Sequence, residues 1–219
     1  MRRPGRITTG QKRALQDLLP RWGLPFQQQW IELDSVFGRT APRVLDIGFG
    51  DGDALLTAAA TYPEIDYLGV EVHEPGIGHL LTMIERAQVT NIRIVDRDAV
   101  DVIDQMLPDA SFDAVNLFFP DPWPKKRHHK RRIVQAEFVS SVARVLKPDG
   151  LFHIATDWAN YAEQIDNVMR EAPKFFIAQP QTLRGNALAF RAPTKFERRG
   201  RRLGHEVTDF FYCRSGATT

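Results

Sequence analysis

Residues 44–52 read Val-Leu-Asp-Ile-Gly-Phe-Gly-Asp-Gly, a short apolar run that passes into three glycines within five positions. The apolar run has the length of a buried strand, and the segment after the glycines has helical composition up to Pro63. Glycine lets the backbone turn sharply and approach a ligand closely. The stretch therefore predicts a strand, a tight glycine-rich turn and a helix.

The same alternation continues outward from this stretch. Further strands are predicted at 67–72, 92–95, 114–119 and 151–156, separated by helices at 75–88, 100–107, 133–146 and 158–170. A helix at 11–19 precedes the chain breakers Pro20, Gly23 and Pro25, and strands at 175–178 and 207–212 flank a long basic loop. This order predicts an α/β, Rossmann-like fold: a mostly parallel, seven-stranded sheet with helices on both faces. Ligands of such sheets bind beyond the carboxyl ends of the strands.

Length and composition fit one globular domain spanning residues 1–219. The chain is 43% hydrophobic and 26% charged, which argues against disorder. We expect a basic N-terminal segment and helix (1–40), a cofactor-binding core (41–172) and C-terminal strands with a basic loop (173–219). The single Cys213 cannot form an internal disulfide or start a zinc site. Without a bilayer-length apolar run or a secretory apolar region, we expect a soluble, cytoplasmic protein.

Positive charge is concentrated in three short stretches, although the net charge is only +2. Residues 1–13, 125–132 and 191–202 together hold 17 of the 29 Lys/Arg and one of the 27 Asp/Glu, which leaves 12 bases against 26 acids elsewhere. Concentrated positive charge suits a polyanion, because each neutralised phosphate releases condensed counterions. The alternative is a set of solvated loops without a partner.

The glycine-rich turn is accompanied by a carboxylate at the end of the next strand. Glu71 lies 25 residues after Asp46 and could accept hydrogen bonds from both ribose hydroxyls of an adenosine. Backbone at Gly48 and Gly50 would approach the same ligand. Asp98, after the third strand, could accept from the adenine amino group or could cap a helix.

The acids of the turn distinguish between adenosine ligands. A dinucleotide site would offer GxGxxG and a helix N-terminus facing a pyrophosphate. Here the spacing is GxGxG, and Asp46, Asp51 and Asp53 would repel a pyrophosphate. Carboxylates instead suit the cationic amino group and sulfonium of S-adenosyl-L-methionine, which we favour over NAD. A third possibility is that these glycines only form a tight connection between the strand and the helix and bind no ligand.

Residues 118–124, FFPDPWP, follow the fourth strand and fix their backbone with three prolines. Asp121 and Trp123 could form a pocket for an unstacked base, with the carboxylate accepting from a guanine edge and the indole stacking on the ring. Core packing of Trp123 and a structural cap by Asp121 are the alternatives.

The possible methylation reactions differ in whether they need a proton acceptor. Guanine N7 carries an in-plane lone pair and no hydrogen, so its methylation needs no proton acceptor. The product gains positive charge, which a carboxylate such as Asp121 would stabilise, and alignment would supply the rest. Methylation of an exocyclic amine, which does lose a proton, remains the second possibility.

The second and third basic stretches supply further candidates. Side chains of 125–132 would bind phosphates, giving affinity rather than sequence choice. Adjacent His128 and His129 diverge and lack a nearby acid or Cys, so we expect no metal site. Asp157, at the same sheet edge as Asp121, could also cap the next helix. Glu197 stands alone among six bases and, from charge alone, reads as their salt-bridge partner.

At this point the motifs resemble a known family. VLDIGFGDG, GVEVH, FFPDPWPKKRHHKRR, ATDW and TKFERRGRRLGH look like the bacterial tRNA (guanine-N7)-methyltransferases, class I enzymes that modify guanine 46 in the variable loop. The resemblance runs from about Arg6 to Tyr212, and PDPWPKKRHHKRR is its most specific part. The glycine-rich turn is shared by most class I methyltransferases.

The resemblance assigns roles that the residues alone left open. It implies cofactor contacts by Asp46, Glu71, Asp98 and Asp121, with Asp121 also catalytic. It implies substrate contacts by Lys125, Asp157, Thr194, Lys195, Phe196 and Glu197, and RNA contacts by Arg127, His128, His129, Lys130, Arg131 and Arg132. An RNA-binding protein with a vestigial cofactor site is the alternative from a different class. We expect tRNA as partner, no membrane and no metal, and a monomer or homodimer.

Overall fold

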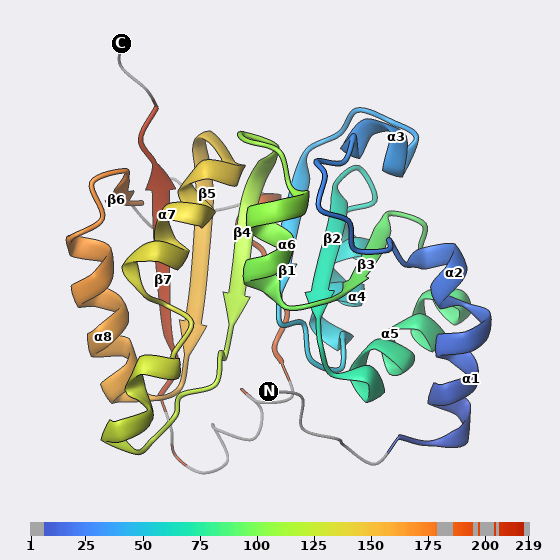
Figure 1. Ribbon diagram of the computed structural model, residues 1–219, viewed down its shortest axis with the longest axis horizontal. Coiled ribbons are helices and arrows are strands. Elements are labelled where there is room, and N and C mark those ends of the chain that lie inside the picture. Colours follow the sequence, from blue (N-terminus) through green and yellow to red (C-terminus); the bar gives the residue numbers. More distant parts are fainter. Residues whose placement is uncertain (1–6, 179–185, 195–196, 198–203, 205, 217–219) are drawn as a thin grey trace.

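The computed structural model describes residues 7–178, 186–194, 197, 204 and 206–216 (Figure 1). Its seven-stranded sheet has the order β3-β2-β1-β4-β5-β7-β6. The strands are β1 (Arg43–Ile47), β2 (Asp66–Glu71), β3 (Ile92–Asp96), β4 (Phe112–Phe118), β5 (Leu146–Thr156), β6 (Phe175–Ile177) and β7 (Thr208–Arg214). β1 to β5 pair in parallel, whereas β7 is antiparallel to β5 and β6. The mostly parallel Rossmann-like sheet is confirmed.

Helices connect these strands. They are α1 (Thr9–Asp17), α2 (Leu19–Trp22), α3 (Leu33–Phe37), α4 (Asp53–Thr61), α5 (Glu74–Ala87), α6 (Ala99–Met106), α7 (Ala136–Val145) and α8 (Ala159–Arg170), with 3-10 helices η1 (Lys126–Arg131) and η3 (Ala187–Ala189). α1 begins with a capping box, in which Thr8 and Gln11 satisfy each other's backbone N–H groups at 2.9 and 3.2 Å. Among the described residues, no helix is long and apolar enough to cross a membrane.

The sheet separates two apolar cores because strand side chains alternate between its faces. Leu45 and Ile47 of β1 pack with the residues of α6, α7 and α8, whereas Val44 packs with α4, α5 and α1. Figure 1 shows α6 and α7 in front of the sheet. Asp46 is two residues after Val44 in the same strand, and therefore lies on the same face of the sheet, the one covered by α4 and α5.

The predicted boundaries differ most from the structure at three places. The helix expected from Ile133 begins only at Ala136, because the backbone is extended at Arg132 and at Gln135, which is the N-cap. Extended chain starts at Leu146 rather than at residue 151. Pro20 does not end helical structure: it lies in the first turn of α2, where its missing N–H costs nothing.

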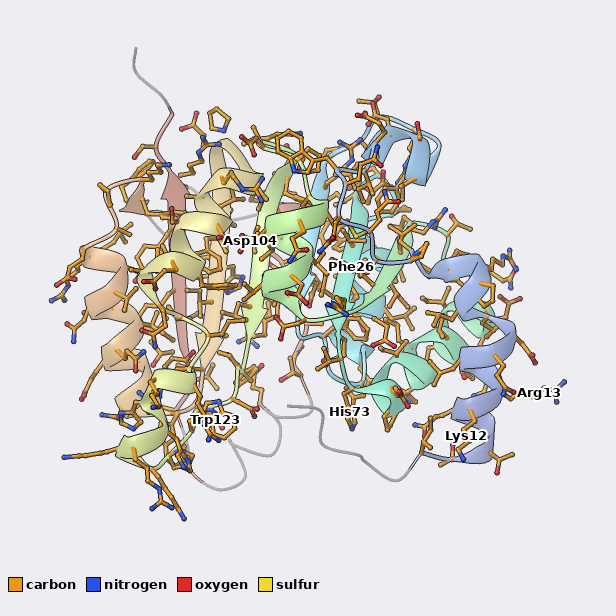
Figure 2. All side chains as sticks on the ribbon, viewed as in Figure 1. Lys12, Arg13, Phe26, His73, Asp104 and Trp123 are labelled. Atoms are coloured by element: carbon orange, nitrogen blue, oxygen red, sulfur yellow. The ribbon has the colours of Figure 1, made fainter. Side chains whose placement is uncertain are left out.

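All five parallel strands end at one edge of the sheet, the lower edge in Figure 1. The N-terminus of α5 and the helix η1 lie at the same edge. Figure 2 shows His73, which precedes α5, and Trp123, which precedes η1, along it. The segments predicted to carry function therefore converge.

Candidate functional site

The glycine-rich turn adopts a backbone that needs glycine. Gly48, Gly50 and Gly52 have φ values of 70°, 63° and 81°, in the left-handed region. The N-terminus of α5 packs directly on this turn, since a Cβ on Gly76 would lie 1.9 Å from the carbonyl oxygen of Gly50. The turn is thus fixed from two sides, by β1 and by α5.

Glu71 is oriented by backbone donors at the end of β2. Its Oε2 accepts from Gly50 N–H at 2.9 Å, and its Oε1 accepts from Val72 and His73 N–H at 2.7 and 3.0 Å. A carboxylate has about four lone-pair positions. These contacts leave room for roughly one further donor, fewer than the two ribose hydroxyls expected from the sequence.

Asp46 is 6% exposed and lines a small pocket at the sheet edge. The pocket is lined by Asp46, Gly48, Phe49, Gly50, Asp51, Ala54, Leu55, Phe118, Phe119 and Thr194. Burial raises the pKa of Asp46 to about 7; the Asn116 amide opposes this shift and the Glu71 charge adds to it. Because Asn116 Oδ1 is buried without a hydrogen-bond partner, this end of the pocket offers oxygen acceptors suited to a cationic group.

Asp98 adopts the helix-cap alternative. It is the N-cap of α6, and its side chain accepts from the Val100 backbone N–H at 3.0 Å. The residue is exposed and is not among the residues that line the pocket.

The segment after β4 carries two strained residues. Phe119 and Trp123 have φ values of 51° and 44°, which cost of order 1–3 kcal/mol each in side chains of this size. Trp123 is half-buried: the Arg131 guanidinium lies over its ring at 5.1 Å, and His128 meets it edge-on at 5.9 Å. Asp121, between the strained residues, is exposed.

Arg132 corrects the prediction of an RNA contact. Its side chain is 2% exposed and donates to the Pro122 carbonyl at 2.8 Å, to Asn160 at 2.9 and 3.3 Å, and to Gln164 Oε1 at 2.9 Å. Its guanidinium also lies over the Tyr161 ring at 4.7 Å. All of these partners except Pro122 belong to α8, so Arg132 ties the Asp121 segment to that helix and cannot face a phosphate.

The remaining members of the second basic stretch lie at the surface. Lys125, Arg127, Lys130 and Arg131 are exposed, and His128 and His129 are half-exposed. Desolvation and the charges of Arg131, Arg127 and Lys125 lower the pKa of His128. The described residues contain no group of His, Cys, Asp or Glu that could hold a metal.

Little of the first basic stretch can be placed. Residues 1–6 lie outside the described residues. Arg13 of α1, labelled with Lys12 in Figure 2, forms an ion pair with Asp17 at 3.1 Å.

Three further candidates lie at the same sheet edge. Asp157 is half-buried after β5 and is not a helix cap, since the N-cap of α8 is Trp158. Thr194 lines the pocket, and its hydroxyl accepts from the Glu197 backbone N–H at 3.1 Å. Glu197 is 1% exposed and forms an ion pair with Arg191, in agreement with the salt-bridge reading. Lys195 and Phe196 lie outside the described residues.

Sequence reasoning missed four polar side chains near the pocket. They are Asn116 of β4, His153 of β5 and Asp209 of β7, together with Arg191, which lies between η3 and β7. Arg191 was counted only as part of a basic stretch. Asn116 and His153 stand in apolar strands, and a polar residue at a buried strand position is the signal that could have identified them.

Comparison with known proteins identifies the family. A family model described as "Putative methyltransferase" matches residues 40–210. The chain is 51% identical over 217 residues to the tRNA (guanine-N(7)-)-methyltransferase of Alkalilimnicola ehrlichii, covering 97% of this chain and 90% of that protein. It is 50% identical over 221 residues to that of Halorhodospira halophila, covering 97% and 92%. The chain belongs to the tRNA (guanine-N7)-methyltransferase family.

Solved structures resemble this family member in fold. The 16S rRNA methyltransferase KamB superposes with a TM-score of 0.60 at 15% identity, covering 84% of this chain and 93% of the other. A 16S rRNA (adenine(1408)-N(1))-methyltransferase from Catenulisporales acidiphilia gives 0.54 at 18% identity, covering 86% and 94%. At these identities the likeness supports the Rossmann-like methyltransferase fold alone.

Separate replacement of the neighbours Arg131 and Arg132 in this tRNA (guanine-N7)-methyltransferase family member tests whether Arg132 has a structural role. Arg132→Gln leaves buried acceptors without donors and should destabilise the fold by about 2–3 kcal/mol. Arg131→Gln should leave the melting temperature almost unchanged, because Arg131 is exposed. Thermal unfolding followed by circular dichroism measures both. Equal melting temperatures for Arg132→Gln and the unmodified protein would contradict the structural role.

Proposed function

We propose that this protein transfers a methyl group from S-adenosyl-L-methionine to N7 of guanine 46 in the variable loop of tRNA, giving 7-methylguanosine. The observation that carries this proposal is the roughly 50% identity, over nearly the whole chain, to proteins named tRNA (guanine-N(7)-)-methyltransferase. We also propose that the protein works in the cytoplasm, as a single methyltransferase domain and as a monomer or homodimer.

The pocket residues fit S-adenosyl-L-methionine. Buried acceptors at Asp46 and Asn116 suit its α-ammonium group, and the carboxylate of Glu71 suits a ribose hydroxyl. Backbone at Gly48 and Gly50 admits close approach. We assign Asp98 to the adenine end of the same site. When bound, the cofactor supplies an electrophilic methyl carbon on its sulfonium.

Asp121 is the proposed catalytic residue. It lies two residues beyond Phe119, which lines the pocket, and we assign its carboxylate to a position beside the bound guanine. Guanine N7 loses no proton on methylation, and the ring becomes positively charged. A carboxylate beside the ring stabilises that charge as it develops. The strained, braced backbone around Asp121 holds it in place for this purpose.

Contacts with the tRNA substrate are assigned to residues near the two basic stretches 125–132 and 191–202, at the sheet edge that carries the pocket. Lys125, Asp157, Thr194, Lys195, Phe196 and Glu197 are proposed to contact the guanine and its neighbours. Arg127, His128, His129, Lys130 and Arg131 are proposed to contact the RNA backbone, whereas Arg132 braces the segment from inside. Exposed Lys and Arg of η1 favour this role, since they can reach phosphates.

Labelling of an unmodified tRNA transcript tests the reaction. With radiolabelled S-adenosyl-L-methionine, we expect one label per tRNA at a variable-loop guanine, located by cleavage chemistry specific for 7-methylguanosine. Label without such cleavage would favour methylation of an exocyclic amine. RNA binding without any label would favour the RNA-binding protein with a vestigial cofactor site.

Asp121→Ala is the control within this assay. It should abolish turnover and leave tRNA affinity nearly unchanged, because the carboxylate acts on the charge that develops during transfer. A variant that keeps most of its activity would remove Asp121 from the mechanism.

Cofactor affinity should depend on pH through Asp46. With a pKa of about 7 in the free protein, Asp46 is protonated below that pH and loses its attraction for an ammonium group. The apparent Kd for S-adenosyl-L-methionine should therefore be about tenfold higher at pH 6 than at pH 8. Titration calorimetry across this range measures it. Asp46→Asn should bind weakly at every pH. His79 of α5, whose Nδ1 lies 2.9 Å from the carbonyl oxygen of the pocket residue Asp51, supplies the control: His79→Gln should keep the slope. A persisting slope in Asp46→Asn would refute the assignment.

The exposed cations of η1 should set the salt dependence of tRNA binding. Replacing Arg127, Lys130 and Arg131 together with Gln removes three candidate phosphate contacts. The slope of log K against log salt concentration should then flatten by about 2–3. Filter binding between 50 and 200 mM salt measures it. Arg170→Gln is the control: Arg170 is an exposed arginine of α8 that pairs with Asp166, and its loss should leave the slope as in the unmodified protein. An unchanged slope in the triple variant would mean that η1 faces away from RNA.

A further inference from the structure

A chain of ionic hydrogen bonds joins β5, β7 and the segment that lines the pocket. His153 of β5, 1% exposed, lies 2.9 Å from Asp209 Oδ1 through its Nε2. Both Asp209 oxygens accept from one edge of the Arg191 guanidinium, Nε at 2.9 Å and Nη2 at 3.0 Å. Arg191 Nη1 donates to the buried Glu197. The guanidinium thus connects two carboxylates that lie 12 positions apart in the chain.

The same guanidinium also contacts the end of β4. Its Cζ lies 5.7 Å from the ring centroid of Phe118 and 5.6 Å from that of Phe119. Phe118 and Phe119 line the pocket with Thr194, and Asp121 follows two residues later. Arg191 therefore touches both segments that border the methyl-transfer site, one through rings and the other through Glu197.

Burial makes these contacts strong. The side chains of Arg191 and Glu197 are 11% and 2% exposed, so their charges are poorly solvated and depend on each other. The two carboxylates hold the pKa of Arg191 above its ordinary value, and the His153 and Arg191 contacts lower the pKa of Asp209. Burial lowers the pKa of His153, and the hydrogen bond to Asp209 opposes this shift.

We propose that Arg191 is a positioning residue for methyl transfer: it holds Glu197 and Thr194 against the Phe118–Phe119 end of β4 and so aligns the guanine with Asp121. This proposal rests on the proposed function and adds a residue that touches neither cofactor nor RNA. A lysine could replace it only in part, because an ammonium group keeps the charge but lacks the planar fork that serves two carboxylates while stacking on rings.

Arg191→Gln and Arg191→Lys test the proposal in the full-length protein. With saturating tRNA and S-adenosyl-L-methionine, kcat should fall about 10–100-fold for Gln and less for Lys, because displacement of aligned groups by about 1 Å has an effect of that size. The Kd for S-adenosyl-L-methionine should stay within about threefold, since Asp46 and Glu71 do not contact Arg191.

Arg144→Gln is the matched control. Arg144 is also a partly buried arginine with a carboxylate and two carbonyl partners, namely Asp109 and the backbone of Leu107 and Ile103, at the end of α7 away from the site. It should lower the melting temperature and leave kcat unchanged. A comparable loss of kcat in Arg144→Gln, or an unchanged kcat in Arg191→Lys and Arg191→Gln, would overturn the proposal.

A double variant separates positioning from an independent effect. If Arg191 acts through Glu197, Arg191→Gln combined with Glu197→Gln should lose no more activity than the more severe single variant. If the two losses of activity multiply in the double variant, Arg191 does not act through Glu197.

Rates are scored as total label transferred to RNA, whereas the proposed function is scored by the position of the label. Label away from guanine N7 would refute the proposed function and still test Arg191. The absence of any label with the unmodified protein would refute both.

Discussion

Parallel hydrogen bonding of β1 with β2 and β4 fixes the position of the strand ends that form the cofactor pocket. The register pairs Ile47 with Val70 on one side and with Leu117 on the other. The next residues of the three strands, Gly48, Glu71 and Phe118, therefore lie in one row at the sheet edge. Slipping one strand by a single residue would turn its alternating side chains to the wrong face, exposing apolar residues and burying polar ones. The same register that builds the two cores thus assembles the cofactor pocket.

The features that were predictable from sequence are those set by short-range patterns. Apolar runs, helical spacing and a glycine-rich turn need no distant partner, and the strand order of a Rossmann-like sheet places their ends together. Arg131 and Arg132 show what such patterns miss. They are neighbours of one residue type, yet Arg131 is exposed and Arg132 is buried against Asn160 and Gln164 of α8. Only the packing of α8, about 30 residues later in the chain, distinguishes them.

Glu197 shows the same limit for acidic residues. Its isolation among six bases indicated a salt bridge, and the structure gives it Arg191 as partner. The sequence could not show that this arginine also binds Asp209 of β7 and contacts the rings of Phe118, the last residue of β4, and Phe119. A count of basic residues therefore overestimates the positive charge that RNA could reach, because the side chains of Arg132 and Arg191 bind partners inside the protein.

These two arginines hold the segment that carries Asp121 from both ends. Arg191 contacts Phe118 and Phe119 before it, and Arg132 binds the Pro122 carbonyl after it. The left-handed backbone at Phe119 and Trp123 costs of order 1–3 kcal/mol each. A hydrogen bond to a charged group contributes about 1.5–3 kcal/mol, so the bond from Arg132 to the Pro122 carbonyl is of the same order as the strain at one of these residues. Because Asp121 is exposed, its position depends on this bracing of the flanking backbone rather than on packing of its own side chain.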